Sequence, residues 1–321
     1  MTRVLVTGGA GTIGRAVVER LTSDADWEVR VSDFREPPQW MREACEIHQG
    51  DLREPDVARA ATSGCTHVIH LAAIVGGIAN FHKLPHTLLE MNTGLYNGVF
   101  RAALDESVER LLYVSSSMVF ENATEFPTTE AHVRGVPTPH SAYGFSKLAG
   151  EIYCRALHDE HGLPFTICRP FNAYGPGESP GDEPGIAHIV PDLIVKAQAG
   201  MTPLPIFGSG EQTRTLTHTR DIADGIVTAL ASPAGLNEDF NISAGDELSV
   251  AEIARVVWEA CGRDPEQFEL EHQPSFEVDV QRRWPSVEKA KALLGWEAQI
   301  PVREGIAETA DWLAGHEVEW I

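Results

Sequence analysis

A chain of 321 residues is long enough to bury a large core, either as one large domain or as two domains that share a cleft. Its 47 acidic residues outweigh its 25 lysines and arginines, which gives a formal net charge of −22 at pH 7. Because such a chain repels phosphate backbones and anionic lipid surfaces, we expect neither nucleic acid nor a membrane among its partners.

The cysteines and the first residues of the chain indicate the cellular compartment that we expect. Five cysteines are scattered without a C-x-x-C pair, which is typical of reduced cysteines in a cytosolic protein. Met1-Thr2-Arg3 leads directly into the first predicted strand, so we expect no signal peptide. No apolar stretch is long enough to span a bilayer, and the 13 histidines lack metal-binding spacing. We therefore expect a cytoplasmic protein without a metal site.

The first elements in the chain predict a dinucleotide site. Residues 3–7 form a short apolar run typical of a buried strand, and residues 15–21 have a helical pattern. A glycine-rich turn lies between them, and this context makes the motif credible. Glycines there allow a pyrophosphate to approach the start of the helix. The residues that we expect at the cofactor are Gly8, Gly11, Thr12, Ile13 and Gly14.

The second predicted strand, residues 28–32, ends at Asp33. A carboxylate about twenty residues after the glycine turn binds the ribose hydroxyls of NAD and repels the 2′-phosphate of NADP. Arg35 weakens that preference, because a nearby arginine can accept the phosphate. We predict NAD as the cofactor.

Strand and helix signals alternate through the rest of the first half. We expect strands at 46–49, 66–71, 110–115 and 165–169, and helices at 55–63, 88–106 and 141–160. This alternation predicts an α/β fold with a doubly wound parallel sheet of the Rossmann type, which binds ligands beyond the carboxyl ends of its strands. Five residues at or just past these ends should share one crevice: Asp33, Asp51, Ala72, Ser116 and Asn172.

The second half has shorter elements. We expect helices at 189–200, 219–231, 249–261, 287–294 and 302–313, with Ser249 as a helix cap and Glu252 as its partner, and short strands at 203–207, 214–218 and 240–243. The predicted domains are a dinucleotide-binding domain at 1–171, to which 211–240 returns, and a smaller interleaved α/β domain at 172–210 and 241–321.

The segment from Tyr143 to Lys147 indicates the chemistry. Residues four apart share one face of a helix, so the charge of Lys147 can favour the phenolate of Tyr143. A phenol ordinarily titrates near pH ~10, and this shift would let it accept a proton near neutrality. A serine from the cluster at 115–117 can complete the hydrogen bonding to a substrate oxygen.

These motifs together resemble the extended short-chain dehydrogenase/reductase family, specifically its nucleotide-sugar epimerases and dehydratases. Further motifs that carry the resemblance are Asp51-Leu52, Leu71-Ala72-Ala73, Asn92, Arg169-Pro170-Phe171-Asn172 with Tyr174-Gly175-Pro176, the run from Gly208 to Arg214, and the closing Lys289 to Trp296. Asn92 is expected to be a buried residue that supports the site.

The resemblance implies roles for individual residues. It implies Ser116, with Ser117 as the near alternative, Tyr143 and Lys147 as catalytic residues. It implies that the cofactor also contacts Asp51, Leu52, Leu71, Ala72, Ala73, Tyr143, Lys147 and Pro170. It implies that the smaller domain binds a nucleotide sugar as the substrate. The substrate contacts that it implies are Ser117, Asn172, His188, Val190, Phe207, Arg214 and one of Arg282 or Arg283. The spacing to Lys289 favours Arg283 over Arg282. Dimerisation is usual for relatives, so the resemblance implies a homodimer that pairs through the helices predicted at 88–106 and 141–160.

The family reaction begins when a sugar carbon gives a hydride to NAD while Tyr143 takes the hydroxyl proton. Dehydratases and decarboxylases place an acid after the catalytic serine, where this chain has Met118, which cannot exchange protons. His188 matches the histidine of the GDP-fucose synthase type, where a lone histidine is more often a binding or structural residue than a proton donor.

Four hypotheses follow. The first is NAD-dependent epimerisation at C4 of a UDP-hexose or UDP-uronic acid through a 4-keto intermediate. The second is a GDP- or dTDP-sugar 4-ketoreductase or 3,5-epimerase that uses His188, and the third is a dehydratase or decarboxylase with displaced acids. The fourth is a non-enzymatic, dinucleotide-sensing regulator, against which the intact set of Ser116, Tyr143 and Lys147 argues.

Overall fold

The computed structural model describes residues 2–75, 83–178, 180, 187–275 and 280–315. Its centre is a seven-stranded sheet in the order β11-β6-β5-β4-β1-β2-β3, in which all neighbouring strands are parallel. The strands are β1 (Thr2–Thr7), β2 (Trp27–Asp33), β3 (Glu46–Gln49), β4 (His67–His70), β5 (Arg110–Val114), β6 (Phe165–Pro170) and β11 (Glu238–Ile242). The predicted doubly wound fold is confirmed. Because the strand order reverses between β1 and β4, the crevice for a ligand opens there.

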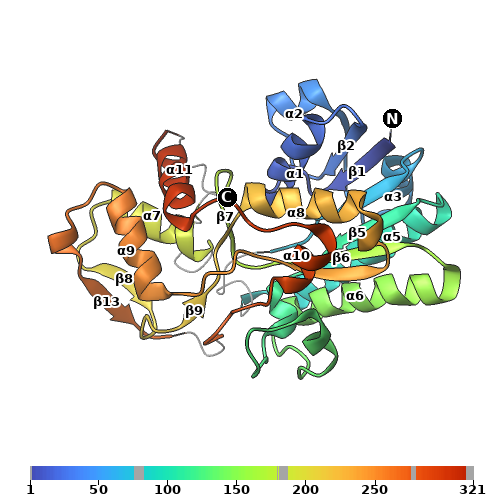
Figure 1. Cartoon of the computed structure of the whole chain (residues 1–321). Coiled ribbons are helices and arrows are strands. Elements are labelled where there is room, and N and C mark those ends of the chain that lie inside the picture. The colour runs from blue at the N-terminus through green and yellow to red at the C-terminus, as the bar shows by residue number, and fades with distance from the viewer. Residues whose placement is uncertain (1, 76–82, 179, 181–186, 276–279, 316–321) are drawn as a thin grey trace.

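Helices cover both faces of this sheet (Figure 1). One face carries α1 (Thr12–Thr22), α2 (Gln39–Ala44) and α8 (Thr219–Ala231), and the other carries α3 (Pro55–Thr62), α5 (Pro85–Asp105) and α6 (Ala142–His161). Each face has its own apolar cluster, so central strands such as β1 are buried on both sides. This double burial explains why these strands are apolar runs without alternation.

A second lobe lies beside the carboxyl ends of the strands (Figure 1). Its helices α7 (Ile189–Gln198), α9 (Val250–Ala260) and α11 (Val302–Gly315) enclose a third apolar cluster. Three two-stranded sheets accompany them: β7 (Ala173–Tyr174) with β10 (Thr217–His218), β8 (Leu204–Phe207) with β13 (Leu270–Gln273), and β9 (Thr213–Arg214) with β12 (Leu248–Ser249).

The chain crosses between the two lobes more often than the sequence predicts. After α8 it completes the main sheet as β11, and α10 (Glu288–Leu294) also packs against that sheet. Ala290 and Trp296 belong to the same apolar cluster as α8, although 241–321 is predicted to belong to the smaller domain. The described part of that range is therefore shared between the lobes.

Several local elements differ from the sequence prediction. The predicted strand at 214–218 is two strands, β9 and β10, which pair with different partners. The short helix α2, strands β7, β12 and β13, and the 3-10 helices η1 (Ser117–Phe120), η2 (Glu130–Arg134), η3 (Pro233–Gly235) and η4 (Pro265–Gln267) were not predicted, because elements this short carry little periodic signal. The predicted cap of α9 is confirmed, since Ser249 and Glu252 form a capping box. Among the described helices, none has the length and apolar character needed to cross a membrane.

A buried ion network ties α6 to two strands of the sheet. The fully buried Arg169 donates two hydrogen bonds of 2.7 Å to Glu151 and one of 2.7 Å to Asp239. Ser115, at the end of β5, donates to Glu151 at 2.7 Å, and Lys289 of α10 donates to Asp239 at 2.7 Å. The network therefore fixes α6 at the strand ends that carry the predicted catalytic residues.

Replacing Arg169 by Met should strongly destabilise the fold, because it leaves Glu151 and Asp239 buried with too few partners. Breaking a buried ion pair from one side costs about 3–5 kcal/mol. The matched control is Arg303→Met, which removes an exposed pair with Glu259 and should cost about 1 kcal/mol or less. Urea unfolding of both variants measures the difference, and equal midpoints would contradict the importance of the network.

The same network should lose its effect in acid. Burial alone would raise the pKa of Asp239, but the charges of Arg169 and Lys289 outweigh it and hold the pKa well below its ordinary value. A carboxyl with a lowered folded pKa stabilises the fold above its unfolded pKa of about 3.9 and loses this contribution as the pH falls. The excess cost of Arg169→Met over the control should therefore shrink below about pH 4.

Candidate active site

A cavity of about 1040 Å³ opens at the carboxyl ends of the strands and is lined by residues of both lobes. Every predicted cofactor, catalytic and substrate residue lines it, with the exception of Arg282. The cavity is thus formed by residues from both halves of the chain, as expected for the crevice of a doubly wound sheet.

The glycine turn after β1 is shaped by close backbone approach. Gly8 has φ +71°, and a Cβ there would lie 2.7 Å from the backbone nitrogen of Ala72, just past β4. A Cβ on Gly14 would lie 2.2 Å from the carbonyl oxygen of Gly8. Only glycine fits at both positions, and α1 starts directly after the turn, so its first N–H groups can bind a pyrophosphate.

The end of β2 presents a buried carboxylate to the same cavity. Asp33 is 4% exposed, and it accepts hydrogen bonds of 3.0 Å from the backbone N–H groups of Ala10 and Arg35. The guanidinium of Arg35 lies 3.3 Å from this carboxylate, so the arginine pairs with Asp33. Asp51 similarly pairs with Arg53. A glycine turn that a Cβ would block, a helix start and a strand-end carboxylate together fit NAD.

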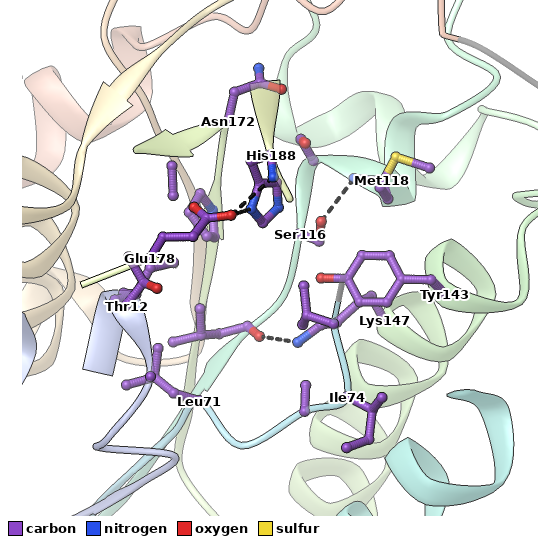
Figure 2. Close-up of a pocket in the computed structure, with 18 of the residues that line it drawn as sticks. Thr12, Leu71, Ile74, Ser116, Met118, Tyr143, Lys147, Asn172, Glu178 and His188 are labelled. Atoms are coloured by element: carbon purple, nitrogen blue, oxygen red, sulfur yellow. Dashed lines mark hydrogen bonds and ion pairs between the residues drawn. The ribbon is translucent and has the colours of Figure 1, made fainter. Parts of the chain in front are cut away.

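The three predicted catalytic residues lie together and are nearly buried (Figure 2). Ser116, Tyr143 and Lys147 are 9%, 6% and 3% exposed. Ser116 precedes η1 and accepts a 3.2 Å hydrogen bond from the backbone N–H of Met118. Lys147 donates to the carbonyl oxygen of Val114 at 3.0 Å, and its Nζ lies 5.9 Å from the centre of the Tyr143 ring.

Burial controls the protonation of this pair. It raises the pKa of Tyr143 to about 12, although a hydrogen bond with Ser116 and the charge of Arg283 oppose it. Burial also lowers the pKa of Lys147 to about 7, against the opposing charge of Glu151. Ser116 and Arg283 lower the tyrosine pKa, and the predicted effect of the Lys147 charge on Tyr143 stays a prediction. In the protein alone the phenol stays protonated.

The residues around this pair have distinct supporting contacts. Ser115 faces the buried Glu151, so Ser116 is the serine that meets Tyr143. Asn92 is fully buried and bonds to both backbone groups of Ile74 and to Ser146. The expected burial and hydrogen bonding of Asn92 are confirmed, and its support of the site stays a prediction.

The two candidate arginines point to different places. Arg283 lines the cavity, where its Nη2 lies 2.8 Å from the sulfur of Met118 and its Nη1 lies 3.4 Å from Oδ1 of Asn172. Arg282 lies outside the cavity lining and forms two hydrogen bonds, of 2.7 and 2.8 Å, with Glu247. Its guanidinium also lies 4.9 Å from the ring centre of Trp284.

The remaining predicted substrate residues line the half of the cavity formed by the second lobe. Arg214 donates a 2.7 Å hydrogen bond to the carbonyl oxygen of Val280, which orients its side chain. Phe207 ends β8, and Lys196 lies 5.5 Å from its ring centre. Val190 is fully buried in the first turn of α7. Arginine and aromatic side chains are suited to a diphosphate and a base.

His188 stands immediately before α7, and Glu178 holds it from a preceding loop (Figure 2). Oε1 of Glu178 lies 2.7 Å from Nδ1 of His188 and accepts a 2.9 Å bond from its backbone N–H. The charge of Glu178 raises the pKa of His188, while desolvation by the surrounding protein and the charge of Arg283 lower it to a smaller extent, and 44% of the side-chain surface stays exposed. The sequence did not point to Glu178, because a contact ten residues away in a loop leaves no periodic signal.

The model of the NAD dependent epimerase/dehydratase family matches residues 4–243. The chain belongs to this family. It is 30% identical to UDP-glucuronic acid decarboxylase 1 of Xenopus tropicalis over 96% of this chain and 71% of that protein. This chain superposes on the solved structure of UDP-glucose 4-epimerase from Thermotoga maritima with UDP-glucose with a TM-score of 0.86. The two sequences are 27% identical, and the match covers 98% of this chain and 99% of that chain. The UDP-glucose 4-epimerase of Thermus thermophilus in complex with NAD has a TM-score of 0.85, with 28% identity over 98% and 99%.

Replacing Tyr143 by Phe should lower kcat by about 10²–10⁴-fold, because it removes the proton acceptor while keeping the ring. The control is Tyr153→Phe, on the exposed side of the same helix, where the hydroxyl donates to Asn97 at 3.1 Å. Turnover and the amount of bound NAD should be measured together. Full activity of the Tyr143 variant would contradict the assignment.

Replacing Arg283 by Ala should weaken substrate binding by roughly tenfold to a hundredfold, as expected when a hydrogen bond from a charged group worth about 1.5–3 kcal/mol is lost. Arg282→Ala is the matched control, because its guanidinium pairs with Glu247 outside the cavity lining. The KM of each variant measures this. An equal effect of both substitutions would show that the placement of the two arginines is wrong.

Proposed function

We propose that the protein is an NAD-dependent epimerase that inverts C4 of a UDP-hexose or a UDP-uronic acid. One observation carries the proposal. Ser116 and Tyr143 meet in the cavity that also holds the dinucleotide turn, while the thioether of Met118 takes the place beside them where an acid would be needed. We therefore assign Tyr143 as the proton carrier for the sugar hydroxyl.

The residues divide the reaction as follows. Tyr143 accepts the proton of the C4 hydroxyl, and Ser116 donates a hydrogen bond to the same oxygen as the ketone forms. The chemistry that bound NAD supplies is reversible hydride acceptance, together with one positive charge in the cavity. The charge of Arg283 and the hydrogen bond with Ser116 counter the burial that raises the pKa of this phenol. After the ketone has turned so that the hydride would return to the opposite face of C4, Tyr143 gives the proton back to the C4 oxygen.

The relatives include 4-epimerases, which support this choice, and enzymes named for other reactions. Some are named UDP-glucose 4-epimerases, and another is named a UDP-glucuronic acid decarboxylase. A decarboxylase or dehydratase would need an acid or base beside Ser116, where Met118 lies. A 3,5-epimerase or ketoreductase is the second candidate, because His188 faces the cavity with a carboxylate partner.

The proposal extends to assembly and compartment. Phe145, Ile152 and Tyr153 expose apolar surface along α6, at 43%, 59% and 37%. We propose that α5 and α6 pair with the same helices of a second copy, which would cover this surface. We place the enzyme in carbohydrate metabolism in the cytoplasm, where its five free cysteines would stay reduced.

Purified protein should convert UDP-glucose to its C4 epimer, or UDP-glucuronic acid to its C4 epimer, without added cofactor. Chromatography of the nucleotide sugars after incubation measures this, with the Tyr143→Phe variant as the blank. A need for added NADH or NADPH would indicate a ketoreductase. Release of carbon dioxide or loss of water from the sugar would contradict C4 epimerisation.

A further inference from the structure

Glu178 holds His188 by two contacts to one oxygen. Its Oε1 accepts the backbone N–H of His188 at 2.9 Å and lies 2.7 Å from Nδ1. Because a carboxylate only accepts hydrogen bonds, Nδ1 must carry a proton in this pair. This contact fixes the ring orientation and leaves Nε2 for the cavity, whose lining includes both residues.

The loop that carries Glu178 rests on the dinucleotide turn. Thr12, the first residue of α1, donates a 3.3 Å hydrogen bond to the carbonyl oxygen of Gly177. Gly177 has φ +100°, and a Cβ there would lie 3.4 Å from the side chain of Arg15. Because Gly177 precedes Glu178 directly, the carboxylate is held in place by the first lobe while His188 begins a helix of the second.

The ring of His188 lies at the reacting end of the cavity. The charge of Arg283 acts on both His188 and Tyr143, and the Arg283 guanidinium contacts Met118 and Asn172. Figure 2 shows His188 below Asn172, with its ring on the side of the view toward Ser116. A group in this position meets the sugar of a nucleotide sugar whose C4 hydroxyl lies at Tyr143.

The charges around His188 favour its protonated form. The charge of Glu178 is the largest influence and raises the pKa of His188, whereas Arg283 opposes it from the loop before α10. On α7, Asp192 is held by Lys196 at 2.6 Å, so these two charges largely offset each other. Across the cavity, burial raises the pKa of Tyr143, so its phenol adds no charge in the protein alone. An imidazolium has N–H donors on both nitrogens and no lone pair with which to remove a proton.

We propose that Glu178 is a positioning residue that holds His188 as a hydrogen-bond donor to an oxygen of the sugar. This inference rests on the proposed function. The pair then selects the sugar part of the substrate, and not the nucleotide. The ligand class is a nucleotide sugar with an oxygen acceptor on the ring face turned toward α7.

The test compares Glu178→Gln with the wild type. Glutamine keeps an oxygen acceptor for the backbone N–H and for Nδ1 but removes the charge. NMR titration of the ring should place the pKa of His188 lower in the variant, a change that a merely structural role would not produce. Calorimetry should show UDP-glucose binding weakened roughly tenfold near neutral pH, while binding of UDP alone is unchanged. UDP-glucose binding should weaken as the pH rises and His188 loses its proton, and this loss should begin at a lower pH in the variant than in the wild type.

Two further variants complete the design. His188→Asn should also weaken UDP-glucose relative to UDP and should abolish this pH dependence. Glu160→Gln is the control, because Glu160 pairs with His161 at 3.4 Å on an exposed helix end, and it should change neither binding nor the titration of His188.

The outcomes separate this proposal from the proposed function. An unchanged pKa of His188 in Glu178→Gln, or equal weakening of UDP and UDP-glucose, would overturn the role of Glu178. A wild-type protein that binds UDP-glucose and shows these differences but forms no C4 epimer would instead contradict the proposed function. If UDP-glucose does not bind, UDP-glucuronic acid is the second probe, and the NMR titration decides the role of Glu178 in either case.

Discussion

The docking of α6 on the end of β5 is the constraint on which the site depends. Three buried hydrogen bonds set it: Lys147 to the carbonyl of Val114 at 3.0 Å, Tyr113 to the carbonyl of Lys147 at 3.2 Å, and Ser115 to Glu151 at 2.7 Å. Because a buried polar group left without a partner costs about 1–3 kcal/mol, the helix has little freedom to slide or turn. Its position brings the phenol of Tyr143 to the serine at the strand end.

The same burial that fixes the geometry also sets the chemistry. It raises the pKa of Tyr143 to about 12 and lowers that of Lys147 to about 7, so burial opposes a phenolate at Tyr143. The charge of Arg283 acts in the other direction and lowers the pKa of Tyr143. The second lobe thus contributes more than binding, since Glu178 and His188 add a fixed contact at the same end of the cavity.

The sequence was sufficient where a local signal determines structure. The glycine turn, the strand ending at Asp33 and α8 at Thr219–Ala231 were all predicted, because backbone sterics and apolar periodicity decide them. The sequence could not firmly decide whether Arg282 or Arg283 faces the cavity, because adjacent loop residues have no periodicity. The orientation depends on partners that are distant in sequence, such as Glu247, which pairs with Arg282. The contact between Glu178 and His188 is likewise a tertiary contact within a loop. Burial also decides the pKa of Tyr143, and the spacing to Lys147 does not reveal it.

The central claim is that one hydride leaves C4 and returns to the same carbon while a single phenol carries the proton. The most direct measurement uses UDP-glucose, or UDP-glucuronic acid, with deuterium at C4, followed by mass spectrometry and NMR of the epimerised product. The account predicts that the deuterium stays at C4 of the product and that no label enters from solvent at C3 or C5. Loss of the label from C4, or uptake of solvent hydrogen at C3 or C5, would contradict it.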